Sequence, residues 1–175
     1  MVLCGMFAAL VAIGAFIQIP VPYMDYFTLQ FFFVLLAGLI LGADKGAISV
    51  GCYVLLGLVV VPIFAAGGGI GYIFRPSFGY LVGFIVSAYV TGKVCEKLKA
   101  SYKNYLLACL AGFVVTYAIG IVYKFIILNF YAHTPATLGV IFLSCFPLDM
   151  PGDFVLCLLA AGVGLRMRKS GFYLS

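Results

Sequence analysis

The scarcity of charge between long apolar runs is the feature that most constrains the fold of this chain. Only 9% of its residues are charged and 66% are hydrophobic, whereas a water-soluble domain carries about 25% charged residues. Because so few charges cannot cover a surface in water, we expect the outer surface to face lipid. With the bilayer as solvent, any charge or amide that remains inside the protein becomes a candidate functional group.

The apolar runs predict an all-α integral membrane protein, a bundle of six transmembrane helices. A spanning helix needs about 20 apolar residues, so residues 1–175 have room for one transmembrane domain and none for a soluble catalytic domain. The first run has no basic start and leads into further spans, so we interpret it as retained and not as a signal peptide. The expected spans lie near 3–19, 28–43, 46–66, 79–92, 105–128 and 150–165.

The basic residues predict the orientation of the bundle. With six spans, one set of loops holds Lys45, Lys93, Lys97, Lys99, Lys103, Arg166, Arg168 and Lys169. Arg75 and Lys124 fall at the other side. The positive-inside rule makes the first set cytoplasmic, with both termini inside the cell. The basic segment 93–103 is then an anchor to anionic lipid or a docking surface for a cytoplasmic partner. The outer loops are expected near 20–28, 67–78 and 129–149.

Several kinds of function are not supported by the sequence. The basic residues form no stripe with interleaved aromatics, so we expect no nucleic-acid binding. The six cysteines form no C-x-x-C pair and the only histidine is His133, so no metal site is predicted. There is no Walker motif for ATP, no H-E-x-x-H and no G-x-S-x-G. A small intramembrane enzyme built on Asp149, Asp153 and His133 remains an alternative, as does a purely structural membrane subunit.

Three polar features are expected on the outer face. Gln30 heads the second span, and a lone amide at that depth needs a partner, either a backbone group or a ligand. Asp153 follows Pro151 and Gly152 at the start of the last span, where a carboxylate suits the positive helix end. The glycine-rich outer loop is expected to be a re-entrant loop or lid, although a flexible surface turn is an alternative. The further candidate contacts in this loop are Gly68, Gly69, Tyr72, Arg75, Ser77 and Tyr80.

The order of these motifs resembles the BioY family of biotin transport proteins. The motifs are PVP, TLQ, LLAGLILG, PSFGYLVGF and PGD, from the first outer loop to the last helix. The resemblance implies a substrate-binding S component of an energy-coupling factor transporter, in the plasma membrane of a prokaryote. It implies a six-helix fold, an outward-facing pocket with biotin as the ligand and no other cofactor, and two kinds of partner: a transmembrane T component and two cytoplasmic ATPases.

The resemblance also suggests roles for single residues. Gln30 can donate and accept, Asp153 can accept from the ureido N–H groups, and Tyr72 and Tyr80 can cover the ring. In such families an A-x-x-x-A face of the first helix contacts the T component. Ala8 and Ala12 match that face, although small residues four apart serve internal packing equally well.

Two positions depart from the family pattern. Leu156 stands where the family usually has a lysine, and Arg75 stands where it usually has glycine. We hypothesise that Arg75 or Lys124 meets the ligand carboxylate. A different vitamin as ligand would also explain the change.

Overall fold

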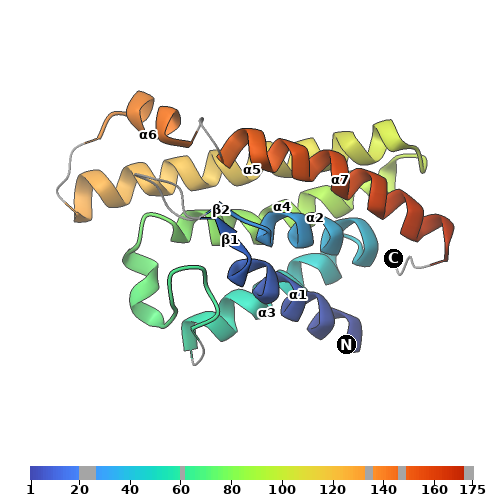
Figure 1. The fold of residues 1–175 in the computed structure, drawn as a ribbon, viewed down its shortest axis with the longest axis horizontal. Helices are drawn as coiled ribbons and strands as arrows, with labels where there is room; N and C mark the ends of the chain where they lie inside the picture. The colour runs from blue at the N-terminus through green and yellow to red at the C-terminus, as the bar shows by residue number, and fades with distance from the viewer. Residues whose placement is uncertain (20–26, 60–61, 133–135, 146–148, 172–175) are drawn as a thin grey trace.

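A computed structural model describes residues 1–19, 27–59, 62–132, 136–145 and 149–171 of the chain. Within these ranges the protein is mostly helical (Figure 1). The prolines of the first outer loop, Pro20 and Pro22, and the histidine of the enzyme alternative, His133, lie outside the described residues.

The predicted apolar runs correspond to helices. The elements are α1 (Val2–Phe16), β1 (Gln18–Ile19), β2 (Phe27–Thr28), α2 (Gln30–Leu41), α3 (Ala43–Val59), the 3-10 helix η1 (Ile70–Phe74), α4 (Phe78–Lys97), α5 (Tyr102–Ile126), the π-helical turn η2 (Ile127–Tyr131), α6 (Leu138–Cys145) and α7 (Asp149–Lys169). The two short strands pair antiparallel. The expected spans match α1 to α5 and α7, whereas α6 lies in a predicted outer loop.

Among the described residues, three helices are long and apolar enough to cross a bilayer by length and composition. They are α4, α5 continued through η2, and α7, while α1 and α2 are shorter apolar helices. The expected helical, membrane-spanning architecture is therefore present in the described residues. The count of six spans stays a prediction.

Helix α2 is at the centre of the bundle. It is apolar on all sides, and a helix of that kind is stable only when it is buried. All its residues except Phe32 and Phe33 are buried, and it packs against α1, α3, α4 and α7. Gly42 follows with a positive φ of 82°, a conformation that favours glycine. The chain then turns directly into α3.

Helices α4 and α5 pack closely through small residues. A Cβ on Gly83 would lie 3.0 Å from the backbone oxygen of Thr116, and one on Gly112 would lie 2.3 Å from the hydroxyl of Thr91. Such contacts leave no room for a larger side chain at either glycine. Small residues at four-residue spacing let two helices approach in this way.

The connections separate into two groups at opposite ends of the molecule (Figure 1). The start of α1, the end of α7 and the α4–α5 connection share one end, called here the basic end. The β1–β2 pair, η1 and α6 share the other, called the loop end. This arrangement matches the alternation of loops expected from the sequence. The side of the membrane that each end faces stays a prediction.

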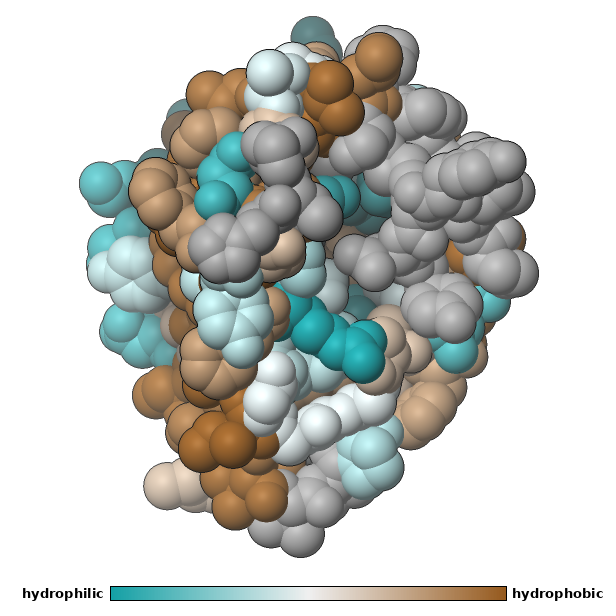
Figure 2. Space-filling view, turned by 90° about the vertical axis from the view of Figure 1, so that its left-hand side faces the viewer, coloured by the Kyte–Doolittle hydropathy of each residue, from teal (hydrophilic) through white to brown (hydrophobic). Residues whose placement is uncertain are grey.

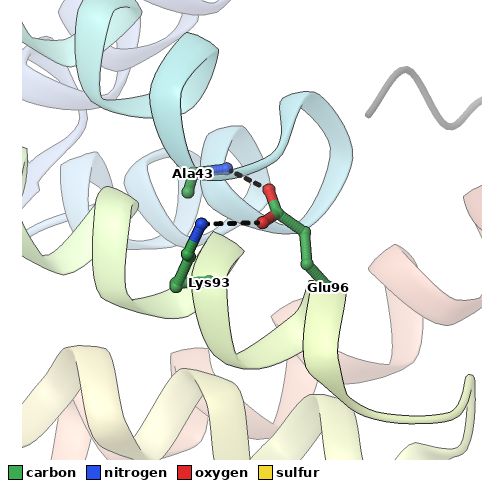
Figure 3. A network of polar contacts seen from close by, with 3 residues as sticks. All are labelled: Ala43, Lys93 and Glu96. Carbon is green, nitrogen blue, oxygen red and sulfur yellow. Dashed lines mark hydrogen bonds and ion pairs between the residues drawn. The ribbon is translucent and has the colours of Figure 1, made fainter.

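The basic end is held by contacts between helices. Glu96 near the end of α4 accepts a hydrogen bond at 2.8 Å from the backbone N–H of Ala43 (Figure 3). The Lys93 ammonium lies 3.7 Å from the same carboxylate. On the far side of the bundle, Arg168 donates to the hydroxyl of Tyr105 at 3.0 Å.

Candidate ligand-binding site

A cavity of about 100 Å³ lies at the loop end, between α2, α4, α5 and α7. By the same measure, roughly 10–15 Å³ suffices for one water molecule, so this cavity is open to a larger ligand. Figure 2 looks onto the loop end and shows hydrophilic side chains near the middle of this face, with hydrophobic surface to one side of them. Six predicted site residues line the cavity: Gln30, Tyr72, Ser77, Tyr80, Lys124 and Asp153.

The cavity has apolar walls with a few polar groups. Phe27, Phe31, Leu81 and Phe84 supply much of the apolar wall. This composition is typical of sites for small organic molecules, in which the apolar wall gives affinity and the polar groups fix orientation.

Gln30 is held in position by a chain of hydrogen bonds. Its side chain is only 4% exposed. Its Nε2 donates to the hydroxyl of Tyr53 at 2.5 Å, and that hydroxyl donates to the carbonyl of Ile63 at 3.1 Å. The hydroxyl of Thr28 donates to its Oε1 at 3.2 Å. The amide is therefore oriented by side chains, and not by the backbone cap that the sequence left open. The amide nitrogen of Gln30 has a second N–H, which these hydrogen bonds do not use.

Asp153 lines the opposite wall, in the second turn of α7. The hydroxyl of Tyr117 on α5 donates to its Oδ2 at 2.8 Å. The position of Gly152, just before Asp153, has little room for a side chain, because a Cβ there would lie 2.4 Å from the ring of Phe27. The proline–glycine–aspartate segment is thus fitted against the cavity wall, in addition to starting the helix.

The glycine-rich segment forms a third wall through η1. The backbone N–H of Gly69 donates to the carbonyl of Gly57 on α3 at 2.8 Å. Tyr72 in η1 is buried, and the hydroxyl of Ser77 donates to the hydroxyl of Tyr72 at 3.5 Å. Tyr123 of α5 donates to the carbonyl of Ile73 at 2.5 Å. These contacts fix η1 against α3 and α5, where Tyr72 faces the cavity.

Not every predicted contact in this segment lies at the cavity. Gly68 and Gly69 are outside the set of residues that line it. Gly69 has a positive φ of 90°, so its place in the turn before η1 explains the glycine. Arg75 is exposed, and its guanidinium carbon lies 5.4 Å from the centre of the Tyr72 ring. Arg75 therefore covers the outer side of Tyr72, whose ring forms part of the cavity wall.

Of the pair on α1 predicted to contact a partner, Ala8 is buried and Ala12 is partly buried. Ala8 is only 7% exposed, and Ala12 packs against the buried core. The sequence left contact with a partner and internal packing open for these alanines. The side chain of Ala8 is covered by the bundle, and the contact of the pair with a partner stays a prediction. The small residues exposed on α1 are Gly5 and Ala9.

Sequence reasoning missed two polar residues that matter to the cavity. Tyr117 lines it and holds Asp153, and Tyr53 holds Gln30. Asp149, considered from the sequence only as an enzyme candidate, also lines the cavity. One signal was available, since Tyr117 precedes Lys124 by seven residues and the two share a face of one helix.

The fold and the cavity define a class of protein: a multi-pass helical membrane protein with a cavity at one end of its bundle. Comparison with known proteins gives the family. A model of the BioY family matches residues 1–171, and the chain belongs to this family. The resemblance seen in the motifs is confirmed.

Named relatives and a solved structure agree with this placement. A probable biotin transporter BioY from Lysinibacillus sphaericus is 38% identical over 97% of this chain and 86% of its own length. The biotin transporter BioY of Thermotoga maritima is 38% identical over 94% of this chain and 93% of its own. The crystal structure of the S-component for biotin from an ECF-type ABC transporter matches with a TM-score of 0.83 and 25% identity, over 96% of this chain and 89% of that one. These relatives are transport proteins and not enzymes.

Proposed function

We propose that this protein is the substrate-binding subunit of a biotin uptake transporter, and that it captures biotin in the cavity at the loop end. The observation that carries the proposal is the convergence of Gln30 from α2, Tyr80 from α4 and Asp153 from α7 on one cavity. A chain of this family with polar groups from three helices around a single apolar recess is built to bind a small, mostly apolar ligand.

The chemistry of biotin fits these groups. Its ureido group has two N–H donors and one carbonyl acceptor, and its bicyclic ring is apolar. Asp153 accepts from an ureido N–H, and the remaining N–H of Gln30 donates to the ureido carbonyl. Phe31 and Phe84 cover the ring. Buried polar groups that only the right ligand satisfies give strong discrimination against other molecules.

Membrane placement and partners complete the proposal. All six predicted helices cross the bilayer, the loop end faces outward, and both termini are cytoplasmic. Substrate release is driven by a T component and two cytoplasmic ATPases, because this chain has no nucleotide motif of its own.

The segment 67–77 acts as a lid. The face of α1 that meets the T component is the exposed one with Gly5 and Ala9, since Ala8 is covered.

Binding of labelled biotin to the purified protein tests the ligand. We expect Asp153→Asn and Gln30→Ala each to lower the affinity by about tenfold or more, which is the usual cost of an unpaired buried polar group. Asp44→Asn is a matched control, because Asp44 lies in the first turn of α3 beside the basic end. Tight binding of riboflavin or thiamine in place of biotin would assign another vitamin. Unchanged affinity in both site variants, with normal folding, would favour a structural subunit.

Co-purification tests the partner face. Ala9→Trp should leave biotin affinity unchanged and reduce recovery of the T component, because a bulky ring prevents close helix approach. Val114→Trp is the control, since Val114 is exposed on α5. Full recovery with Ala9→Trp would exclude this face of α1.

A further inference from the structure

We infer that Lys124 provides the positive charge for the ligand carboxylate, and that the ligand lies along α5 with its ring at Tyr117 and Asp153 and its acid tail at Lys124. The inference rests on the proposed function and specifies which side chains of the cavity bind the acidic group of the ligand.

A carboxylate that enters an apolar recess needs a cation, because an unpaired buried charge is strongly unfavourable. Leu156, three residues after Asp153 on α7, is uncharged and is 7% exposed within the hydrophobic core. Lys124 is the cationic side chain among the described residues that line the cavity. Arg75 lies outside the lining with its guanidinium over the Tyr72 ring. The geometry therefore favours Lys124 over Arg75, the other cation that the sequence offered.

The acidic residues of the lining favour a cation for the ligand acid. Asp149 and Asp153 both line the cavity, one helical turn apart on α7. A ligand acid adds a third acidic group to a lining with two aspartates and one lysine among the described residues. Without Lys124, the described lining would offer the acid two acidic groups and no cation, which disfavours its ionised form.

The spacing along α5 gives the direction of the ligand. Tyr117, Gly120 and Lys124 are three and four residues apart, so they lie on one helix face. The seven residues from Tyr117 to Lys124 correspond to about 10 Å along the axis. Between them, the ring of Tyr80 lies over Gly120, where a Cβ would come within 2.4 Å of that ring. Along this face of α5, the ligand would therefore meet Tyr117 with Asp153 first, then the ring of Tyr80, and then the ammonium group of Lys124.

A bicyclic urea with a flexible acid tail has the same order of groups. Its ureido ring meets Asp153 and Gln30, its tail passes Tyr80, and its carboxylate reaches Lys124. Asp149 competes with the ligand for the same ammonium, because it lines the same cavity one turn nearer the start of α7.

The test compares biotin with its neutral amide on the purified full-length protein and on Lys124→Met, which keeps a long unbranched side chain without charge. We expect the variant to lose roughly 10- to 100-fold in affinity for biotin, as for a charge-assisted hydrogen bond. Affinity for the amide should change far less, and Lys124→Arg should restore most of the preference for the acid. Equal losses for acid and amide in Lys124→Met overturn the inference.

Arg75→Met is the matched control, since it removes the other cation of the loop end. We expect it to leave the ratio of acid to amide affinity unchanged. A fall in that ratio with Arg75→Met, and none with Lys124→Met, would place the carboxylate at Arg75 and overturn the inference.

A second variant covers the case in which Lys124→Met does not fold. Asp149→Asn removes the competing carboxylate and should raise the affinity for biotin without raising that for the amide. An unchanged ratio would count against the inference. The proposed function fails separately, if the unmodified protein binds neither biotin nor its amide.

Discussion

The hydroxyl of Tyr117 donates a hydrogen bond to Oδ2 of Asp153 across 2.8 Å, and this contact joins α5 to α7 at the cavity wall. A carboxylate with one oxygen held in this way has a fixed orientation toward the ligand. Tyr117 therefore acts as a positioning residue: it sets the direction of the group that is proposed to accept from the ureido ring.

We expect Tyr117→Phe to lower biotin affinity by about tenfold, because hydrogen bonds to charged groups contribute about 1.5–3 kcal/mol. Isothermal titration of the purified protein measures the effect. The loss should be smaller for a biotin analogue with a methylated ureido nitrogen, since that ligand no longer donates to Asp153. An equal loss for both ligands would indicate a structural role only.

Tyr105→Phe is the control for this substitution. Tyr105 is also buried on α5, and its hydroxyl accepts from Arg168 at the basic end. Removing this hydroxyl should leave ligand affinity unchanged. A comparable loss of affinity would mean that hydroxyls along α5 act through the fold in general.

The Gln30–Tyr53 contact leads to a prediction about stability. Tyr53→Phe removes the acceptor of the Gln30 amide and leaves a buried N–H without its partner, which costs about 1–3 kcal/mol. We expect a lower temperature of unfolding in detergent together with weaker biotin binding. Tyr102→Phe serves for comparison, because the Tyr102 hydroxyl makes a longer, exposed contact with the carbonyl of Leu158 at 3.4 Å. Similar destabilisation by both substitutions would contradict the role given to the Gln30 network.

The meeting of Gln30, Tyr80 and Asp153 could be predicted from the sequence, because alternation of spans puts their ends on one side of the membrane. The role of Tyr117 could not. A single tyrosine in an apolar helix has the pattern of a core aromatic, and its hydrogen bond depends on how α5 crosses α7. The short helix α6 was missed because eight residues are too few for a span.

The burial of Ala8 could not be predicted from the sequence either. Residues four apart mark one face of a helix, but the spacing does not say whether that face meets the bundle or its surroundings. In α1 the buried face holds Phe7, Ala8 and Val11. Packing of α1 against α2 and α3 determines which face is buried. The sequence of α1 alone carries no information on that packing.

The close contact of Gly152 with Phe27 predicts an effect on binding more than on stability. A methyl group at Gly152 would lie 2.4 Å from the Phe27 ring, which lines the cavity. The ring is the free end of its side chain, so Gly152→Ala should displace it at a cost near 1 kcal/mol. The displaced ring changes the shape of the wall, and we expect biotin affinity to fall severalfold in the same titration.

Gly51→Ala is the control for added volume, because a Cβ on Gly51 meets nothing within 4 Å. Alanine is favoured over glycine inside a helix by about 1 kcal/mol. This variant should therefore unfold at the same or a higher temperature and bind biotin normally. Normal binding by Gly152→Ala would show that the cavity wall tolerates the shift of Phe27.

The carboxylate of Glu96 caps the start of α3 through the N–H of Ala43, and this contact predicts a loss of stability without a loss of binding (Figure 3). Glu96→Ala removes the cap and should cost about 1 kcal/mol of unfolding free energy. Lys93→Ala removes only the ion pair at 3.7 Å and should cost less, since exposed pairs contribute about 0–1 kcal/mol. Thermal unfolding in detergent measures both variants, and biotin affinity should stay at the unmodified value because the cavity lies at the opposite end. A larger loss from Lys93→Ala would assign the stabilisation to the ion pair, and weaker biotin binding in Glu96→Ala would show that the α2–α3 turn is coupled to the cavity.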